Sequence, residues 1–247
     1  MSDAQASPRG TPYGTLFLVP VALGEDTPWA HFLPAQTQVI AAGLRHFVVE
    51  NARAARAHLK QLDYPHPLRE TDIRELPADA AEPALDALLA PALAGENIGL
   101  MSDAGCPAVA DPGARLVARA HALDLRVAPL VGPSSILLGL MGSGLNGQSF
   151  AFHGYLPVAD AERDAALHAL ENESRKLGRT QIFIETPYRN ERMLDALLRT
   201  LNPETRVCVA CDLNTDGEYV RTLRVRAWRK AARPALARRP ALFLLLA

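Results

Sequence analysis

Cysteine is scarce in this 247-residue sequence, and long apolar runs are missing. Three cysteines, an odd number, do not make a disulfide framework. No apolar run approaches the ~20 residues that span a membrane, and the polar start over residues 1–13 has no apolar signal-peptide core. We therefore expect a cytoplasmic protein without a membrane segment, in which residues 1–13 form a flexible tail.

Several familiar site motifs are also absent. The sequence has no G-x-G-x-x-G after its first apolar segment, no G-x-x-x-x-G-K-[ST] and no G-x-S-x-G. Its seven histidines are scattered without metal-ligand spacing. Cys208 and Cys211 have the spacing of a redox pair, but they lie in an apolar run that predicts a buried strand. Dinucleotide, nucleoside triphosphate, serine hydrolase and zinc sites therefore have no support.

The net charge of −1 hides an asymmetry between the two halves. Residues 1–148 carry 10 Lys or Arg against 15 Asp or Glu, and residues 149–247 carry 16 against 12. The segment 221–239 contains eight basic residues and no acid. Two interpretations are open, a polyanionic partner on the one hand and a solvated edge strand with its loop on the other.

Apolar segments and helical segments alternate along the first half, which predicts an α/β fold with a mostly parallel sheet. Strands are expected at 15–21, 46–51, 73–76, 97–103 and 126–131, and helices at 34–44, 52–62, 80–94 and 112–123. The Gly-rich segment 142–148 predicts a link between an N-terminal domain (14–145) and a C-terminal domain (146–247). For the second domain we expect a mixed sheet with strands at 150–156, 180–185, 206–213, 219–228 and 241–246 and helices at 161–176 and 189–201.

The segment Ser102–Gly113 is the strongest candidate for a ligand site. It follows an apolar strand, precedes a helix and holds two Asp, two Gly and two Pro. Loops at the carboxyl ends of parallel strands share one edge of a sheet, and the loops at 20–26, 50–53 and 132–135 are expected there too. The last of these contains Ser134 and Ser135, which either cap the next helix or leave its N–H groups to a ligand.

In the second half, Glu185 ends a strand, and Arg189 and Arg192 follow at the start of a helix. The two arginines are one turn apart, where they either hold phosphates or are solvated.

These residues resemble the tetrapyrrole methylase family of S-adenosylmethionine-dependent methyltransferases. The most specific motif is Ser102-Asp103-Ala104-Gly105-x-Pro107-x-x-x-Asp111-Pro112-Gly113, which is typical of the branch that methylates a ribose 2′-hydroxyl of small-subunit ribosomal RNA. Three further motifs agree in order and spacing: Gly14-Thr15-Leu16, Val131-Gly132-Pro133-Ser134 and Phe183-Ile184-Glu185-Thr186-Pro187-x-Arg189. The resemblance implies two α/β domains, a cofactor in the cleft between them and a homodimer.

The resemblance also implies roles for single residues. Cofactor contacts are expected at Pro20, Asp103, Ala104, Gly105, Val109, Ser134, Ser135 and Leu213. Methyl transfer needs in-line positioning of the acceptor oxygen and removal of its proton, for which Glu50 and Glu185 are the candidate carboxylates. Arg53, Arg189 and Arg192 are expected to hold the RNA backbone. No metal is expected.

The chain departs from the family pattern on the acceptor side. The ribosomal RNA branch usually has Glu-Asp-Thr-Arg after the second strand, where this chain has Glu50-Asn51-Ala52-Arg53, and Tyr188 replaces a common His. Methylation of ribosomal RNA is the leading hypothesis. Methylation of a small molecule such as a tetrapyrrole, and a non-catalytic RNA-binding module, are the alternatives.

Overall fold

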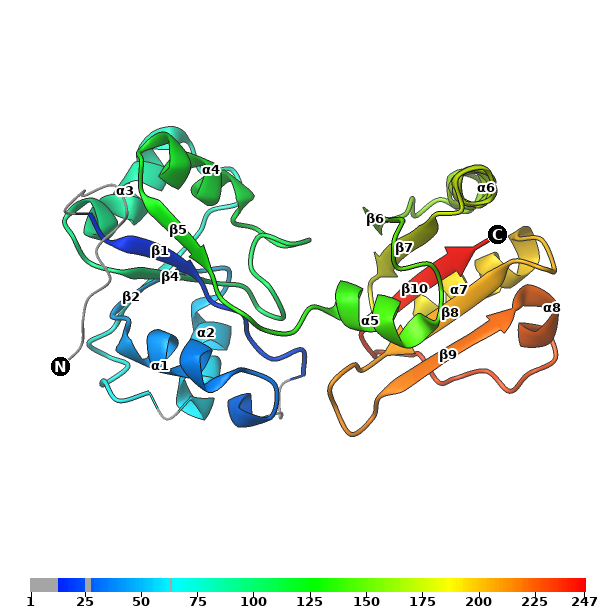
Figure 1. Ribbon diagram of the computed structural model, residues 1–247, viewed down its shortest axis with the longest axis horizontal. Coiled ribbons are helices and arrows are strands. Elements are labelled where there is room, and N and C mark those ends of the chain that lie inside the picture. Colours follow the sequence, from blue (N-terminus) through cyan, green and yellow to red (C-terminus); the bar gives the residue numbers. More distant parts are fainter. Residues whose placement is uncertain (1–12, 25–27, 63) are drawn as a thin grey trace. The chain divides into compact units, whose positions relative to one another are not determined.

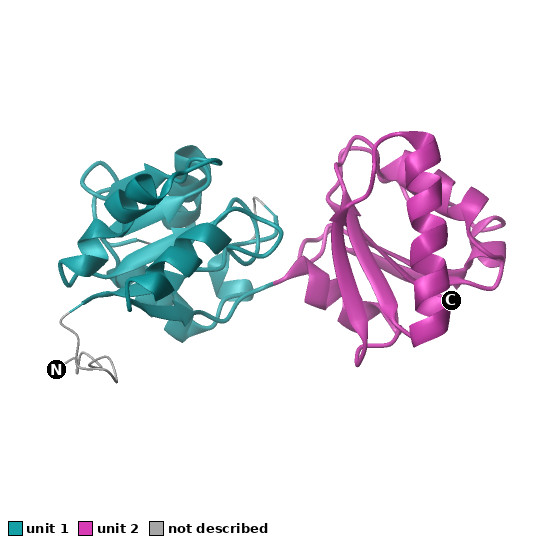
Figure 2. Cartoon of the chain, turned by 90° about the horizontal axis from the view of Figure 1, so that it is seen from above, with its two compact units in different colours: residues 1–133 teal, residues 134–247 magenta. Residues whose placement is uncertain are grey.

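The chain forms two compact units, residues 1–133 and 134–247 (Figure 2). The computed structural model describes residues 13–24, 28–62 and 64–247. Twelve of the residues of the predicted tail, and Glu25 and Asp26 of the first predicted loop, lie outside the described residues. Within the described ranges, no helix has the length and apolar character needed to cross a membrane.

The first unit is built on a five-stranded sheet in which every neighbouring pair of strands is parallel. The order of strands across the sheet is β3-β2-β4-β1-β5. The strands are β1 (Thr15–Leu18), β2 (His46–Val49), β3 (Asp72–Glu75), β4 (Ile98–Met101) and β5 (Arg126–Pro129). The helices are η1 (Trp29–His31), α1 (Ala35–Gly43), α2 (Ala52–Gln61), α3 (Glu82–Leu93) and α4 (Ala114–Ala122).

Helices cover both faces of this sheet, as Figure 1 shows. The helices α3 and α4 enclose one core with Leu89 and Leu116 fully buried, and α1 and α2 enclose the other with Trp29, Phe47 and Leu59 buried. A sheet covered on both faces needs continuous apolar strands, and this is why runs such as Ile98–Met101 lack alternation. The predicted parallel α/β architecture is confirmed, so the carboxyl ends of all five strands meet at one edge.

The second unit has a mixed five-stranded sheet in the order β6-β7-β10-β8-β9, in which only β6 and β7 run parallel. Its strands are β6 (Phe150–Tyr155), β7 (Thr180–Glu185), β8 (Arg206–Cys211), β9 (Tyr219–Arg224) and β10 (Ala241–Leu246). Its helices are α5 (Ser135–Ser143), α6 (Asp160–Leu177), α7 (Asn190–Thr200) and α8 (Val225–Trp228). The predicted mixed sheet is confirmed. Cys208 and Cys211 are buried within β8 as predicted.

One strand prediction is wrong at its end. The alternation over 219–228 predicts a strand with Trp228 on the same face as three polar residues, but β9 stops at Arg224 and α8 begins. The helical turn places Val225 and Trp228, three positions apart, on one buried face. There the Trp228 indole N–H donates to the Val207 carbonyl at 2.8 Å. Burial of a large aromatic side chain thus overrides the local alternation.

The compact units divide at Pro133 and Ser134, twelve residues before the predicted boundary at 145/146. The helix α5 lies between these positions and packs on the second sheet, where Gly139 approaches Leu242 so closely that a Cβ would lie 2.1 Å from its Cδ2. The end of the helix is also tied there, because the Thr222 hydroxyl donates to the Ser143 carbonyl at 2.6 Å. The Gly-rich segment is therefore a turn within the second unit.

Candidate functional site

The Ser102–Gly113 loop leaves the central strand β4 at the carboxyl edge of the first sheet, where the sequence predicts it. A backbone bridge fixes its first part, since the Val21 N–H donates to the Gly105 carbonyl at 2.9 Å. A second tie comes from Cys106, whose thiol lies 3.2 Å from the Pro133 carbonyl oxygen. Loops from β1 and β5 thus hold the loop from β4 between them.

Four residues of this loop have a positive φ: Gly105 at 71°, Ala108 at 66°, Ala110 at 63° and Gly113 at 129°. Glycine tolerates this conformation, but each alanine there costs about 1–2 kcal/mol. Such strain persists only where the surrounding structure over-determines the backbone. The loop is therefore held in a specific conformation, and the two left-handed alanines are a feature that the sequence did not predict.

Three acidic side chains gather at this edge, Glu50 from the end of β2 and Asp103 and Asp111 from the loop. Burial raises the pKa of Glu50, and the Asp103 carboxylate raises it further. The Asp103 N–H, 3.4 Å from Glu50 Oε2, lowers this pKa by a smaller amount. Burial, followed by the nearby Glu50 carboxylate, raises the pKa of Asp111 to about 6. The pKa of Asp103 is raised overall, mainly by burial and also by the Glu75 carboxylate, although His58 lowers it. Desolvation and mutual repulsion make this cluster favourable to a proton or a cation.

The remaining residues predicted in the first unit lie around this loop. Ala104 and Val109 are exposed, whereas Pro20 and Gly105 are buried. Pro20 packs against Gly132, where an added Cβ would lie 2.3 Å from the proline ring. Pro20 is therefore part of the wall that shapes the ends of β1 and β5.

Ser134 and Ser135 stand at the start of α5 in the second unit, and both are half-buried. Ser134 occupies the N-cap position, but its side chain makes no capping hydrogen bond. The sequence left two roles open for this serine, capping of α5 or leaving the N–H groups of the helix to a ligand. The Ser134 hydroxyl does not cap the helix. The first N–H groups of α5 are left without that partner.

Glu185 ends β7, and its side chain is only 2% exposed. Its Oε1 accepts from Arg189 Nη2 and from the Thr186 N–H, each at 2.6 Å, and from Arg189 Nε at 2.9 Å. Arg189 lies just before α7 in a non-helical conformation. The buried Glu185 carboxylate thus orients the guanidinium group of the half-buried Arg189.

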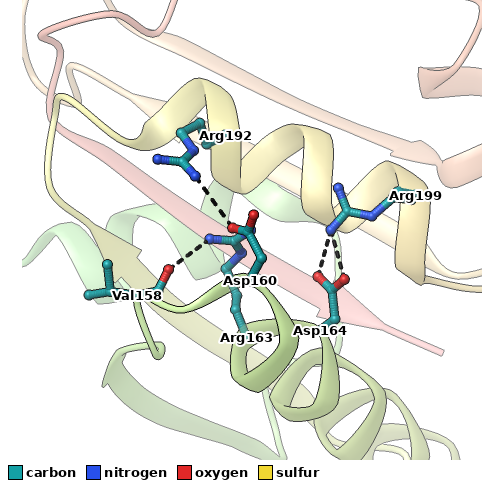
Figure 3. Close-up of polar contacts among 6 residues, drawn as sticks. All are labelled: Val158, Asp160, Arg163, Asp164, Arg192 and Arg199. Carbon is teal, nitrogen blue, oxygen red and sulfur yellow. Dashed lines mark hydrogen bonds and ion pairs between the residues drawn. The ribbon is translucent and has the colours of Figure 1, made fainter.

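Arg192, in the first turn of α7, contacts a different acid from Arg189. Its Nη2 lies 3.4 Å from Asp160 at the start of α6, an acid that Arg163 also contacts at 2.6 Å (Figure 3). Farther along the same two helices, Arg199 contacts both carboxylate oxygens of Asp164. These arginines join α7 to α6, which is a structural role visible only in the fold.

Arg53 is exposed on the first turn of α2, next to the acidic cluster in the chain. The preceding residue, Asn51, is the N-cap of this helix and accepts from the Arg53 and Ala54 N–H groups. The substitution of Asp by Asn at this position therefore preserves the cap.

Leu213 is buried in the turn after β8. Asp212 and Asn214 on either side have positive φ values of 48° and 62°. Arg239 holds this turn in place, since its Nε contacts Asp212 Oδ2 and its Nη2 donates to the Gly217 carbonyl, each at 2.6 Å.

Sequence reasoning missed one residue at the candidate site. His58, on α2, is buried, and its Nε2 lies 3.0 Å from the Asp103 carbonyl oxygen. A lone histidine on a helix carries no motif, so no signal in the sequence marks it. Among the described residues, no group of three or more metal-ligating side chains is suitable for holding a metal.

Comparison with known proteins identifies relatives of this chain. The family model of the Tetrapyrrole (Corrin/Porphyrin) Methylases matches residues 36–227. A protein of Mesorhizobium japonicum named ribosomal RNA small subunit methyltransferase I is 37% identical over 178 residues, which is 72% of this chain and 58% of that protein. The protein of the same name from Vibrio cholerae is 32% identical and covers 89% of this chain and 71% of its own length.

Among solved structures, the methyltransferase CobJ aligns with a TM-score of 0.60 at 16% identity. The alignment covers 96% of this chain and 94% of CobJ, and at this identity it supports the fold alone. The chain spans 58% of the length of the Mesorhizobium japonicum relative, so only part of that protein has a counterpart here.

Proposed function

The chain belongs to the tetrapyrrole methylase family, and from this premise we propose that it is an S-adenosylmethionine-dependent methyltransferase acting on the 2′-hydroxyl of a ribose in small-subunit ribosomal RNA. Relatives that cover most of the chain are named ribosomal RNA small subunit methyltransferases. The observation that carries the proposal is the Ser102–Gly113 loop, which has the motif of that branch and is held in a strained conformation beside three acids. We further propose that the protein acts as a homodimer in the cytoplasm.

The residues of the first unit fit a cationic cofactor. S-adenosylmethionine, when bound, supplies an electrophilic methyl group on a positively charged sulfur. Glu50, Asp103 and Asp111 have raised pKa values mainly because they are desolvated, and a nearby carboxylate raises each of them further; a cation beside them would offset both effects. The residues that we assign to the cofactor are Pro20, Asp103, Ala104, Gly105 and Val109 in the first unit and Ser134, Ser135 and Leu213 in the second.

Glu50 is our candidate for the group that accepts the proton of the ribose hydroxyl. Its raised pKa makes it a stronger base than an ordinary carboxylate, and only one of its oxygens faces the Asp103 N–H. Glu185 is already engaged by Arg189. For Glu185 we therefore propose that it orients Arg189 toward the acceptor.

RNA contact is proposed for Arg53 together with its neighbours on α2. Arg53, Arg56 and Lys60 are exposed, and their spacing places them on one face of the helix. None of the ion pairs among the described residues involves these three cations. Arg189 and Arg192 are proposed to add contacts from the second unit, although each already faces a carboxylate.

The decisive experiment is transfer of a labelled methyl group from S-adenosylmethionine to small ribosomal subunits by the purified chain. We expect incorporation into a nucleotide linkage that resists alkaline hydrolysis, because a 2′-O-methyl group blocks cleavage at that ribose. Cofactor binding without incorporation would refute the RNA proposal and favour a small-molecule acceptor. Absence of cofactor binding would favour the non-catalytic RNA-binding alternative.

Two sets of variants assign the roles. Glu50→Gln should lower kcat by about a hundredfold and weaken cofactor binding by a much smaller factor, whereas Glu70→Gln, at an exposed acid, should change neither. Joint replacement of Arg53, Arg56 and Lys60 by Ala should make the slope of log K against log salt concentration for RNA binding shallower. The change should correspond to the loss of about three phosphate contacts. A matched triple replacement of ion-paired arginines, Arg199, Arg226 and Arg233, changes the net charge equally and should reduce it much less.

A further inference from the structure

His58 reaches the candidate site from the buried side of α2. Its side chain is 8% exposed and lies beside the ring of Trp29, with 6.3 Å between ring centroids. Its Nε2 is 3.0 Å from the carbonyl oxygen of Asp103, 45 positions away in the chain. A carbonyl oxygen only accepts hydrogen bonds, so Nε2 carries the proton and donates it.

The same residue of the loop is held from its other side as well. The Asp103 N–H faces Glu50 Oε2 at 3.4 Å. Side chains of two different elements, the end of β2 and the second turn of α2, thus contact the backbone N–H and the backbone carbonyl of Asp103. The Asp103 residue itself is exposed, so its carboxyl group is left to face outward.

The loop depends on such contacts because its own backbone is unfavourable. Ala108 and Ala110 both have φ values above 60°, a region that disfavours any residue with a Cβ. The ties that hold the loop on the other side come from Val21 and Pro133. His58 supplies the tie on the β2 side, close to the strand β4 from which the loop emerges.

We propose that His58 is a positioning residue, which acts through the Asp103 backbone to hold the Ser102–Gly113 loop in the conformation that binds the cofactor. The inference rests on the proposed function in that it takes the loop as the cofactor site. It adds a residue from outside the loop motif, and it gives Glu50 a second role as the partner of His58 across the Asp103 backbone.

The test compares His58→Leu, which removes the donor, with His58→Gln, whose amide nitrogen restores a donor near the position of Nε2. The control is His46→Leu, because His46 on β2 also makes one polar contact, 3.0 Å to Asp72, away from the loop. Two quantities are measured on the full chain: the amide hydrogen exchange of residues 102–113 without ligand, and the affinity for S-adenosylmethionine by calorimetry. Thermal unfolding establishes that each variant is folded at the assay temperature.

We expect His58→Leu to accelerate exchange in the loop at least fivefold and to weaken cofactor binding by about tenfold, the effect of losing one hydrogen bond. His58→Gln should return both quantities to within about twofold of the original protein, and His46→Leu should leave both unchanged. If His58→Leu does not fold, His58→Asn replaces it, since its shorter amide stops short of the Asp103 carbonyl.

Unchanged loop exchange in His58→Leu would overturn the proposal, whether or not the cofactor binds. Faster exchange with undiminished cofactor affinity would also overturn it, because the loop would then be held for another purpose. If the original protein binds no cofactor at all, the proposed function fails, and the exchange data still decide whether His58 holds the loop.

Discussion

Replacement of Asp111 by Asn should stabilise the first unit at neutral pH. The pKa of this half-buried carboxyl is raised from 3.8 to about 6 by burial and by the Glu50 carboxylate. Well below the unfolded pKa of 3.8 the group is neutral in both the folded and the unfolded chain, so the raised pKa has no effect there. As the pH rises from 3.8 to about 6, the folded state loses stability relative to the unfolded state, since the unfolded carboxyl ionises there and the folded one does not; above that range the loss is complete.

A shift of about two pKa units corresponds to about 3 kcal/mol, and solvent screening of a half-exposed group reduces this to roughly 1.5 kcal/mol. Asparagine has nearly the same shape as aspartic acid and carries no charge that burial would penalise. The expected rise in Tm at pH 7.5 is about 3–6 °C. At pH 4.5 the gain should shrink to about a third, because this pH lies only slightly above the unfolded pKa of 3.8 and the penalty grows with pH between 3.8 and about 6.

Calorimetric unfolding of the original protein and the variant, at several pH values from 4.5 to 8, measures this gain. Asp86→Asn in the same unit is the control with opposite sign, because two contacts with Arg119, at 2.6 and 2.9 Å, lower the pKa of Asp86. That variant should lose stability at neutral pH and lose less as the pH falls toward the lowered pKa. A lower Tm for Asp111→Asn at pH 7.5, or a gain that does not vary with pH, would refute the reasoning.

Three further predictions concern stability. Gly113→Ala should destabilise by about 2 kcal/mol in urea unfolding, because φ is +129° and a Cβ would lie 2.9 Å from Leu100 Cδ2; a neutral result would mean that the turn can relax. Trp228→Phe should cost about 3 kcal/mol in the same assay, since it removes a buried N–H donor and leaves a gap in the core. Arg189→Ala should cost about 3 kcal/mol at pH 7.5 by leaving the Glu185 carboxylate buried without its partner. Adding Glu185→Gln should recover most of that loss, and a double variant as unstable as the single one would contradict this explanation.

The strands and helices were predictable because their apolar patterns have the period of the element that they form. The run Ile98–Met101 is apolar at every position and becomes a central strand covered on both faces. The exception, 219–228, has alternation that fits a strand, yet its last aromatic side chain gains more by entering the core through a helical turn. The sequence pattern of 219–228 alone cannot predict this outcome, because the core that receives Trp228 is formed by β8 and α7, elsewhere in the chain.

The place of the candidate site followed from the sequence, but its supports did not. Gly, Pro and Asp between 102 and 113 mark a shaped loop at the end of a strand, and parallel topology brings Glu50 to the same edge. Left-handed φ values at Ala108 and Ala110 leave no trace in the sequence, since alanine normally indicates a helix. The contact of His58 with Asp103 spans 45 residues and needs the packing of α2 against the sheet before it exists.

Charge is the property for which the sequence was most misleading. The second unit holds sixteen basic residues, but ten of its arginines form ion pairs with acids of the same unit. An arginine paired with a carboxylate adds little field at a distance, because the two charges cancel and a phosphate must compete with the acid. Within the described residues no ion pair involves Arg53, Arg56 or Lys60, although the first unit is acidic in total. A polyanion should therefore respond more to three cations on α2 than to the larger basic excess of the second unit, and net charge by segment is a poor guide to where it binds.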